Sequence, residues 1–367
     1  MSDPRPAASS VAVIVLDNVG GMHTADHDRI TRRMQAARIA TLLALPFNPA
    51  RPAAGPVYVI TADTLDPDTA ARLGVHDESR IYGGVAPWPF VATKAVTHGL
   101  RSSNAVAPQG WNPRLVAALA DCVLLGWTTF SLDDARRAGI DLLETGTVRL
   151  KNVKSTAGRG QTRVRTLAEL EIALADRNPD DIARHGIVVE EDLVDPETLS
   201  VGTTRIGDER IAYWGVQRLT ESPDGETVYG GSDLQVALGD YENLLSFPLP
   251  ERARLAIQFA RAYDAGVFAA YPGLFASRRN YDVIFGLNAQ GIRRTGVLEQ
   301  SWRIGGASGA EIAAIEAFRR DRTRRLVRSE TMEIRSASAS VPDDAVLYYQ
   351  GVDPEAGPLT KYARVVP

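Results

Sequence analysis

The stretch 281–308, YDVIFGLNAQGIRRTGVLEQSWRIGGAS, constrains the fold more than any other part of the sequence. It predicts two strands joined by a polar turn, then a glycine-rich loop and a helix. Asp282 stands at the head of the first strand, Glu299 ends the second, and Arg303 follows just beyond it. Acidic groups at strand ends, followed by an arginine and a glycine loop, suit a site for a hard cation and a phosphate chain.

The length and composition predict a soluble protein of more than one subdomain. A chain of 367 residues is long for a single core, and its 44% hydrophobic and 23% charged residues are ordinary values. The net charge of −4, with both signs interspersed, gives no broad basic field, so general nucleic-acid binding is disfavoured. No stretch approaches the roughly 18 apolar residues of a membrane span, so no membrane association is expected.

The single cysteine and the N-terminus both favour a cytoplasmic protein. Cys122 cannot form an internal disulfide, and its apolar surroundings (ALADCVLLGW) predict a buried small hydrophobe rather than a nucleophile. The first ten residues, MSDPRPAASS, lack the basic start and apolar region of a signal peptide.

The N-terminal part reads as an α/β unit. An apolar run from Val11 to Asp17 predicts a buried parallel strand, a helix runs from Asp26 to about Leu45, and Val57–Ile60 predicts a second strand. A short helix follows from Asp66 to Leu73. The segment 18–28, after the first strand, is a common position for ligand contacts in such units.

The middle of the chain adds two lysines and a glycine loop. The segment 91–100, VATKAVTHGL, predicts the start of a helix that carries Lys94. The segment 147–164, TVRLKNVKSTAGRGQTRV, predicts a strand with Lys151, a loop with Gly158 and Gly160, and a second strand. Such a loop can fold over phosphates through its backbone N–H groups, although a plain hairpin is the commoner outcome. It matches neither the P-loop nor the dinucleotide pattern.

Several further elements follow. The segment 186–193, GIVVEEDL, predicts a strand running into acidic residues, and 199–206 and 210–219 predict two more strands. The glycine-rich segment 228–240 reads as a loop. A helix begins at Pro250, and the last forty residues predict short strands that cover the sheet.

In this order, the pieces resemble the ATP-grasp superfamily, which includes D-alanine–D-alanine ligase and biotin carboxylase. The resemblance spans about residues 90–310 and is strongest in LKNVKSTAGRG, VVEEDLVDPETLSV and DVIFGL…GVLEQSWRIGGAS. The EQSWRIGGAS run is also similar to uncharacterised bacterial proteins of ATP-grasp type. The resemblance implies an α/β (α+β) fold of two α+β lobes after a small α/β domain: 1–90 N-terminal, 91–190 small lobe, 191–328 large lobe, and 329–367 strands packing on the large lobe.

The resemblance also implies ATP and Mg²⁺ as ligands and assigns roles to individual residues. Arg303 and Lys151 would be catalytic, with Arg303 facing phosphate or acyl-phosphate. Asp282, Glu299 and Ser301 would hold magnesium. The nucleotide would be bound by Lys94, Lys151, Gly158, Gly160, Glu190, Glu191, Leu193, Glu197 and Arg218.

Ser301 departs from the family pattern. The superfamily usually has Glu-x-Asn on the second metal strand, where this chain has Glu299-Gln300-Ser301. A serine hydroxyl is a weaker oxygen ligand than an amide oxygen, so this change bears on the metal count and on activity.

Three functions are compatible with these residues. The first is an ATP-dependent ligase that activates a carboxylate as an acyl-phosphate for attack by an amine or similar nucleophile. Its small-molecule substrates would sit against segments 18–28 and 229–233. The second is a small-molecule kinase with the same ATP site, and the third, motivated by Ser301, is an inactive ATP-binding regulatory module. The sequence leaves the oligomeric state open, and a homodimer is compatible with it.

Overall fold

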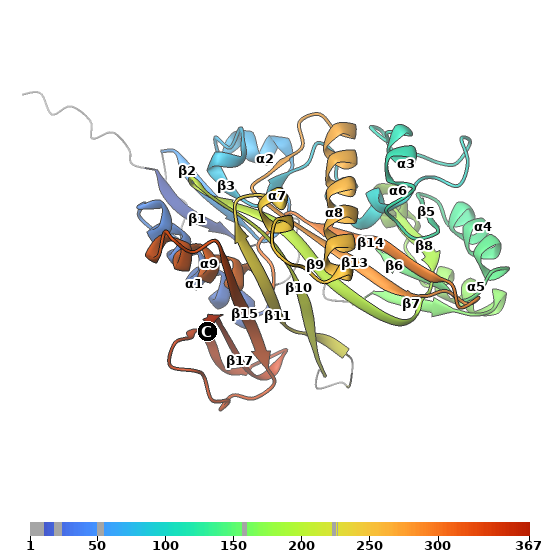
Figure 1. The fold of residues 1–367 in the computed structure, drawn as a ribbon. Coiled ribbons are helices and arrows are strands. Elements are labelled where there is room, and N and C mark those ends of the chain that lie inside the picture. The colour runs from blue at the N-terminus through green and yellow to red at the C-terminus, as the bar shows by residue number, and fades with distance from the viewer. Residues whose placement is uncertain (1–10, 18–23, 50–54, 156–159, 222–224, 226) are drawn as a thin grey trace, which may run out of the picture.

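The computed structural model describes residues 11–17, 24–49, 55–155, 160–221, 225 and 227–367. The chain forms three main sheets, first a three-stranded, then a four-stranded and last an eight-stranded one. In space the eight-stranded sheet lies between the other two (Figure 1). A short pairing of β4 (Gly84–Val85) with β12 (Phe275–Ala276) ties the N-terminal part to the centre. The mixture of helices with parallel and antiparallel sheets confirms the α/β (α+β) fold class.

The N-terminal sheet is parallel, in the order β1 (Ala12–Leu16), β2 (Val57–Thr61) and β3 (Ile81–Tyr82). Its strands form because continuous apolar runs can be buried on both faces, and Val13, Ile14 and Val59 are fully buried. Helix α1 (Asp26–Leu43) packs on one face, and α2 (Pro67–Arg72) begins where the Asp66 side chain accepts the Thr69 N–H. The predicted α/β unit is confirmed.

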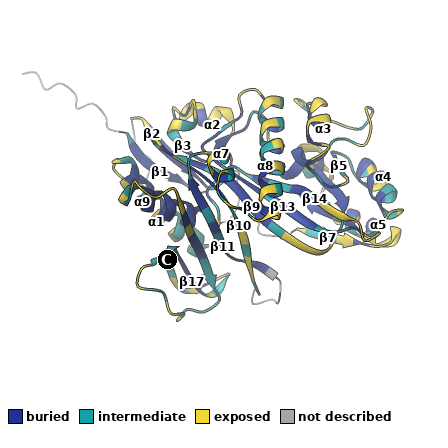
Figure 2. Ribbon diagram, in the orientation of Figure 1, coloured by how far each residue is buried: buried dark blue, intermediate teal, exposed yellow. Residues whose placement is uncertain are grey.

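The central sheet has eight antiparallel strands. Their order is β14 (Arg293–Ser301), β13 (Arg278–Leu287), β9 (Val194–Ile206), β10 (Glu209–Glu221), β11 (Thr227–Leu238), β15 (Leu326–Ile334), β17 (Gly357–Val366) and β16 (Val346–Asp353). Helix α8 (Glu251–Ala270) and the short α7 (Tyr241–Leu245) cover one face, and α9 (Ser308–Arg320) covers the other together with α1. Figure 2 shows the central strands buried between these layers.

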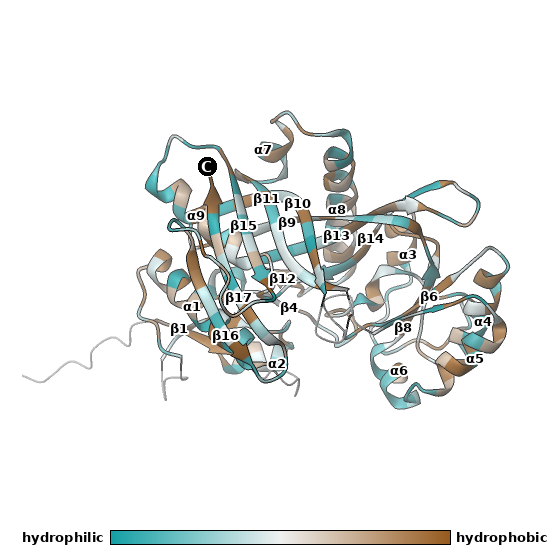
Figure 3. Ribbon diagram, turned by 90° about the horizontal axis from the view of Figure 1, so that it is seen from below, coloured by the Kyte–Doolittle hydropathy of each residue, from teal (hydrophilic) through white to brown (hydrophobic). Residues whose placement is uncertain are grey.

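The third sheet is antiparallel, in the order β5 (Gly126–Thr129), β8 (Ile187–Glu191), β6 (Val148–Asn152) and β7 (Gln161–Val164). Helices α4 (Leu132–Leu143), α5 (Leu167–Ala175) and α6 (Pro179–His185) share its core. Seen from below in Figure 3, this unit stands at one end of the molecule, opposite the N-terminal sheet. Helix α3 (Arg114–Leu119) packs against α8.

Two predicted elements differ from the structure. The segment predicted as a helix from residue 91 contains only a short 3-10 turn, η2 (Lys94–Thr97), because β-branched residues crowd a helix there and Gly99 follows. The segment predicted as a loop at 228–240 is strand β11. Its glycines serve packing rather than flexibility, since a Cβ at Gly231 would lie 2.3 Å from the Thr331 carbonyl oxygen.

Cys122 is buried, as predicted, and burial raises its pKa to about 12, which removes the thiolate needed for nucleophilic chemistry. Among the described residues, none of the helices is both long and apolar enough to cross a membrane.

Candidate functional site

Asp282 and Glu299 lie side by side on one face of the central sheet. They are register partners across β13 and β14, so their side chains point the same way. Ser200 of β9 donates a hydrogen bond to Asp282 Oδ1 at 2.9 Å, and Gln217 of β10 in turn lies 2.9 Å from the Ser200 hydroxyl. Burial and the neighbouring Glu299 charge raise the pKa of Asp282 to about 6. Two neighbouring carboxylates that repel each other favour a cation beside them.

Lys94 reaches this pair from the η2 turn. Its ammonium nitrogen lies 2.5 Å from Oε2 of Glu299, and its side chain is only 8% exposed. The turn forms because Thr93 caps it, accepting the Ala95 N–H at 3.1 Å. Gln300, whose side chain points to the opposite face from Glu299, donates to the Thr93 carbonyl oxygen at 2.5 Å. The turn carrying Lys94 is thereby fixed to β14.

Lys151 and Glu190 form a second buried pair on the four-stranded sheet. Lys151 Nζ lies 2.5 Å from Glu190 Oε1, and His98 Nε2 lies 3.0 Å from Glu190 Oε2. Burial opposes ionisation of Glu190, but the charge of Lys151 and the hydrogen bond to His98 outweigh it and lower its pKa to about 2. Lys94 and Glu299 both act electrostatically on Lys151, so the two pairs adjoin each other.

Beside these pairs lies an apolar patch at the start of β9. Leu193 packs in a small cluster with Leu124, Ile284 and Leu298. Glu191 accepts the Leu125 N–H at 3.1 Å and lies 3.5 Å from the Arg294 guanidinium. A cavity of about 160 Å³ adjoins Glu191. An apolar patch next to backbone groups at the junction of two sheets suits a flat aromatic base.

Arg303 connects the central sheet to the N-terminal sheet. The backbone N–H of Ile304 donates to the Thr61 carbonyl oxygen at 3.1 Å, which places Arg303 at the carboxyl end of β2. Asp63 follows that strand, and burial raises its pKa despite the opposing charge of Arg303. At the carboxyl end of β1, Arg32 pairs with Asp17 at 2.7 Å. Ligands of parallel sheets bind at this edge.

Several of these groups were not predicted from the sequence. Asp63, Arg32, His98 and Gln217 each carry a weak signal on their own, because their partners lie far away along the chain. For Asp63 a signal existed, since it directly follows a predicted strand of an α/β unit.

Two predicted nucleotide contacts are not brought to this site. Gln217 faces Ser200 and Asp282, so its neighbour Arg218 points to the opposite face, where it lies 3.3 Å from both Asp233 and Glu330. Glu197, an odd number of residues from Ser200, also faces away and pairs with Arg252 of α8.

The remaining predicted residues are placed as follows. Gly158 lies outside the described residues, as do residues 18–23 of the predicted substrate segment. Gly160 has a φ of +67°, and its carbonyl oxygen accepts the Asn152 N–H at 2.9 Å. Ser301 Oγ lies 3.5 Å from Nη1 of Arg278.

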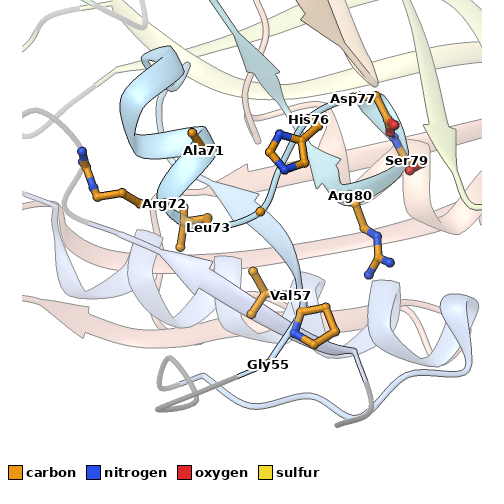
Figure 4. A pocket seen from close by; sticks show the side chains of 11 residues that line it. Gly55, Val57, Ala71, Arg72, Leu73, His76, Asp77, Ser79 and Arg80 are labelled. Carbon is orange, nitrogen blue, oxygen red and sulfur yellow. The ribbon is translucent and has the colours of Figure 1, made fainter. Parts of the chain in front are cut away.

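A larger cavity, of about 620 Å³, lies elsewhere. Figure 4 shows its lining by Val57, His76, Arg80 and the end of α2. Val57 is the first residue of β2, so this cavity lies at the amino end of the strand, opposite to Asp63 and Arg303. It therefore lies apart from the candidate site.

The residues of the candidate site fit a nucleotide triphosphate with a hard cation. Lys94 and Lys151 carry positive charge that can balance the negative phosphates, and the Leu193 cluster provides an apolar surface for the base. In the described part of the chain, no group of three His, Cys, Asp or Glu side chains could hold a metal alone. Magnesium suits such a place, since it commonly takes one or two carboxylates and completes its shell with phosphates and water.

Residues 15–363 match a family described as "Protein of unknown function (DUF3182)". No curated protein matches the sequence.

Solved structures similar to this one include biotin carboxylase from Campylobacter jejuni in a β,γ-ATP complex (10% identity, 99% of this chain and 89% of that chain, TM-score 0.52). A carboxyaminoimidazole ribonucleotide synthase from Aspergillus clavatus complexed with ATP has 13% identity over 98% and 94% of the two chains, with a TM-score of 0.51. The biotin carboxylase domain of Hydrogenobacter thermophilus 2-oxoglutarate carboxylase, solved with MgADP, has 11% identity over 98% and 87%, with a TM-score of 0.51.

Proposed function

The chain belongs to the DUF3182 family and has an ATP-grasp fold, and from the geometry of its site we propose that it is an ATP- and Mg²⁺-dependent ligase. It would activate a carboxylate as an acyl-phosphate, which an amine or similar nucleophile attacks. In this proposal residues 91–190 and 191–328 are the two lobes around ATP, 1–90 form the N-terminal domain, and 329–367 extend the large lobe.

The proposed ATP site uses groups from the central eight-stranded sheet and from the four-stranded sheet. Lys94 and Lys151 hold the phosphates, while the Leu193 cluster and the backbone near Glu191 hold the base. Asp282 and Glu299 hold the magnesium ion, which when bound supplies positive charge against the phosphate oxygens. Both lysines are paired with carboxylates in the structure, at 2.5 Å each, so bound phosphates would compete with those carboxylates for the lysines.

The proposed reaction has two steps. An oxygen of the substrate carboxylate attacks the terminal phosphorus of ATP, the bond to the bridging oxygen breaks, and ADP leaves. The nucleophile then attacks the acyl carbon, phosphate leaves, and the nucleophile loses a proton. In this proposal the Arg303 guanidinium binds the acyl-phosphate through two parallel hydrogen bonds. In this proposal Asp63, whose charge acts on Arg303, receives the proton.

The proposed substrates bind at the carboxyl ends of β1 and β2. Arg32 and Arg303 bring positive charge to this edge, while Asp17 and Asp63 bring negative charge. A mixed lining of this kind suits a pair of substrates in which one carries a carboxylate and the other an amine.

The observation that carries the proposal is the contact of Lys94 with Glu299. The contact brings a lysine, a side chain that commonly binds phosphate, next to a carboxylate, a side chain that commonly binds magnesium. Glu299 is also the register partner of Asp282, so a second carboxylate lies beside it. The test measures magnesium-dependent ADP release by the purified protein with pools of carboxylates and amines. Substituting Glu299→Gln is expected to lower the rate at least about 100-fold, as loss of a charge-stabilising group does in other enzymes.

A matched control uses a carboxylate remote from the site. Glu242, whose side chain is 69% exposed and paired with Arg261, can be changed to Gln with no expected change in ADP release. The proposal fails if no pool supports magnesium-dependent ADP release, or if both variants release ADP at the same rate.

A further inference from the structure

Asn280 lies beside the proposed metal ligands without having been assigned a role. It is two residues before Asp282 on β13, so the two side chains share a face, and in the structure the Asn280 amide nitrogen donates to Asp282 Oδ1 at 3.2 Å. Asn280 is also the register partner of Ser301, the residue that stands where the ATP-grasp pattern has an asparagine. An amide absent from β14 is therefore present directly opposite, on β13.

Asn280 ends a buried chain of polar groups that is short of one proton. The chain has three contacts: Glu311 Oε1 to the Tyr213 hydroxyl at 2.8 Å, that hydroxyl to the Asn280 amide at 2.9 Å, and the amide to Asp282 Oδ1 at 3.2 Å. The tyrosine hydroxyl has one proton, and the amide can present its NH₂ to only one of its two neighbours. Three contacts thus share two hydrogen-bond donors, and one contact is left without a donor.

The position of the missing donor follows from burial. If the amide NH₂ faces Asp282, the deficient contact lies among Glu311, Tyr213 and the amide oxygen. Glu311 and Tyr213 are both fully buried, and the Arg278 guanidinium already pairs with Glu311 at 2.8 Å, so this end of the chain has its positive charge. If the NH₂ faces Tyr213 instead, the hydroxyl donates to Glu311, a strong charged acceptor, and the deficient contact moves to Asp282.

The second arrangement turns the amide oxygen toward Asp282, at the open end of the chain. The oxygen and nitrogen of an amide occupy equivalent positions, so the hydrogen-bond network decides which way the group faces. Asp282 is partly exposed and lies beside Glu299, so a cation can reach this end. Exchanging the amide nitrogen, 3.2 Å from Asp282 Oδ1, for the amide oxygen would bring two oxygens close to the spacing of about 2.9 Å between neighbouring ligands in an octahedral magnesium shell.

We propose that Asn280 is a ligand of the divalent cation, and that its amide oxygen replaces the one that Ser301 cannot provide. The inference rests on the proposed magnesium site of Asp282 and Glu299. Ser301 itself is poorly placed for a cation, because its hydroxyl lies 3.5 Å from the positively charged Arg278. The three ligands would come from β13 and β14, with Tyr213 and Glu311 fixing the orientation of the amide.

The test is a titration of the full-length protein with Mn²⁺ in the presence of ADP and without any substrate, with free Mn²⁺ followed by electron paramagnetic resonance. Asn280→Ala is expected to weaken Mn²⁺ binding at least about 10-fold, in the range seen when groups around protein metals are removed. Asn280→Asp should retain binding, since a carboxylate oxygen takes the same place. Adding Ser301→Asn to Asn280→Ala tests whether the amide can return to β14.

Circular dichroism and thermal unfolding serve to show that each variant is folded. Because Mn²⁺ binding is measured without turnover, the result does not depend on finding the substrates. Unchanged Mn²⁺ affinity in folded Asn280→Ala overturns the inference while leaving the ligase proposal intact, and so does equal weakening in Asn280→Ala and Asn280→Asp. Absence of Mn²⁺ binding by the unaltered protein overturns both.

Discussion

The guanidinium of Arg278 donates a hydrogen bond of 2.5 Å to the backbone carbonyl oxygen of Arg303. One arginine thus positions the backbone of another, and the two have different surroundings. Arg278 is 2% exposed and pairs at 2.8 Å with Glu311, which also accepts the hydroxyls of Tyr82 and Tyr213. Arg303 donates only to the carbonyl of the next residue, Ile304, among the contacts described, and the charge of Asp63 acts on its guanidinium.

This difference predicts that replacing Arg278 lowers mainly the stability of the fold, whereas replacing Arg303 lowers mainly the rate of ADP release. Arg278→Met is expected to lower the free energy of unfolding by about 3 to 5 kcal/mol, because it leaves Glu311 buried without its charged partner. Arg303→Met is expected to change that free energy by less than about 1 kcal/mol while lowering ADP release about 100-fold. Urea denaturation and the ADP assay measure the two effects. Similar losses of stability in both variants would contradict the distinction.

The Glu190 pair predicts a loss of stability in acid. The folded-state pKa of Glu190, about 2, lies below its ordinary value of 4.5, so ionisation stabilises the fold above pH 4.5. This contribution is lost progressively as the pH falls from about 4.5 toward 2. Urea denaturation at a series of pH values should show a shallower decline in Glu190→Gln than in the unaltered protein. At pH 7 the same variant should be less stable by about 3 kcal/mol, because Lys151 is left buried and unpaired.

Arg218 and Glu197 are predicted to be dispensable for the proposed reaction. Their side chains are 44% and 46% exposed and pair on the face away from Asp282. Arg218→Ala and Glu197→Ala should each cost less than about 1 kcal/mol of stability and leave ADP release unchanged. Lys151→Ala is the comparison, with an expected loss of at least about 100-fold in ADP release. A tenfold lower rate of ADP release in Arg218→Ala or Glu197→Ala would contradict this prediction and show that the residue contributes to the reaction.

The elements that carry the site were predictable because their signals are local. The apolar runs of β1 and β2 and the alternation of β13 and β14 appear within a few residues. Asp282, predicted at the head of a strand, lies instead within β13, which begins at Arg278. The order of Lys94, Lys151, Glu190, Asp282, Glu299 and Arg303 was enough to indicate an ATP-grasp fold, which the structure has. The misread segment at β11 shows the limit, because its glycines look like a loop until the neighbouring strand is in place.

The sequence by itself determined most of the strands, the fold class and the types of charged side chain. Only the tertiary structure decided which of those side chains meet. Adjacent strand residues point to opposite faces, so Gln217 joins the site and Arg218 does not, and a shift of one residue would reverse them. Register between strands places Asn280 opposite Ser301, and packing between sheets brings Lys94 to Glu299. These contacts join residues far apart in the chain, or depend on strand register, and no local pattern encodes them.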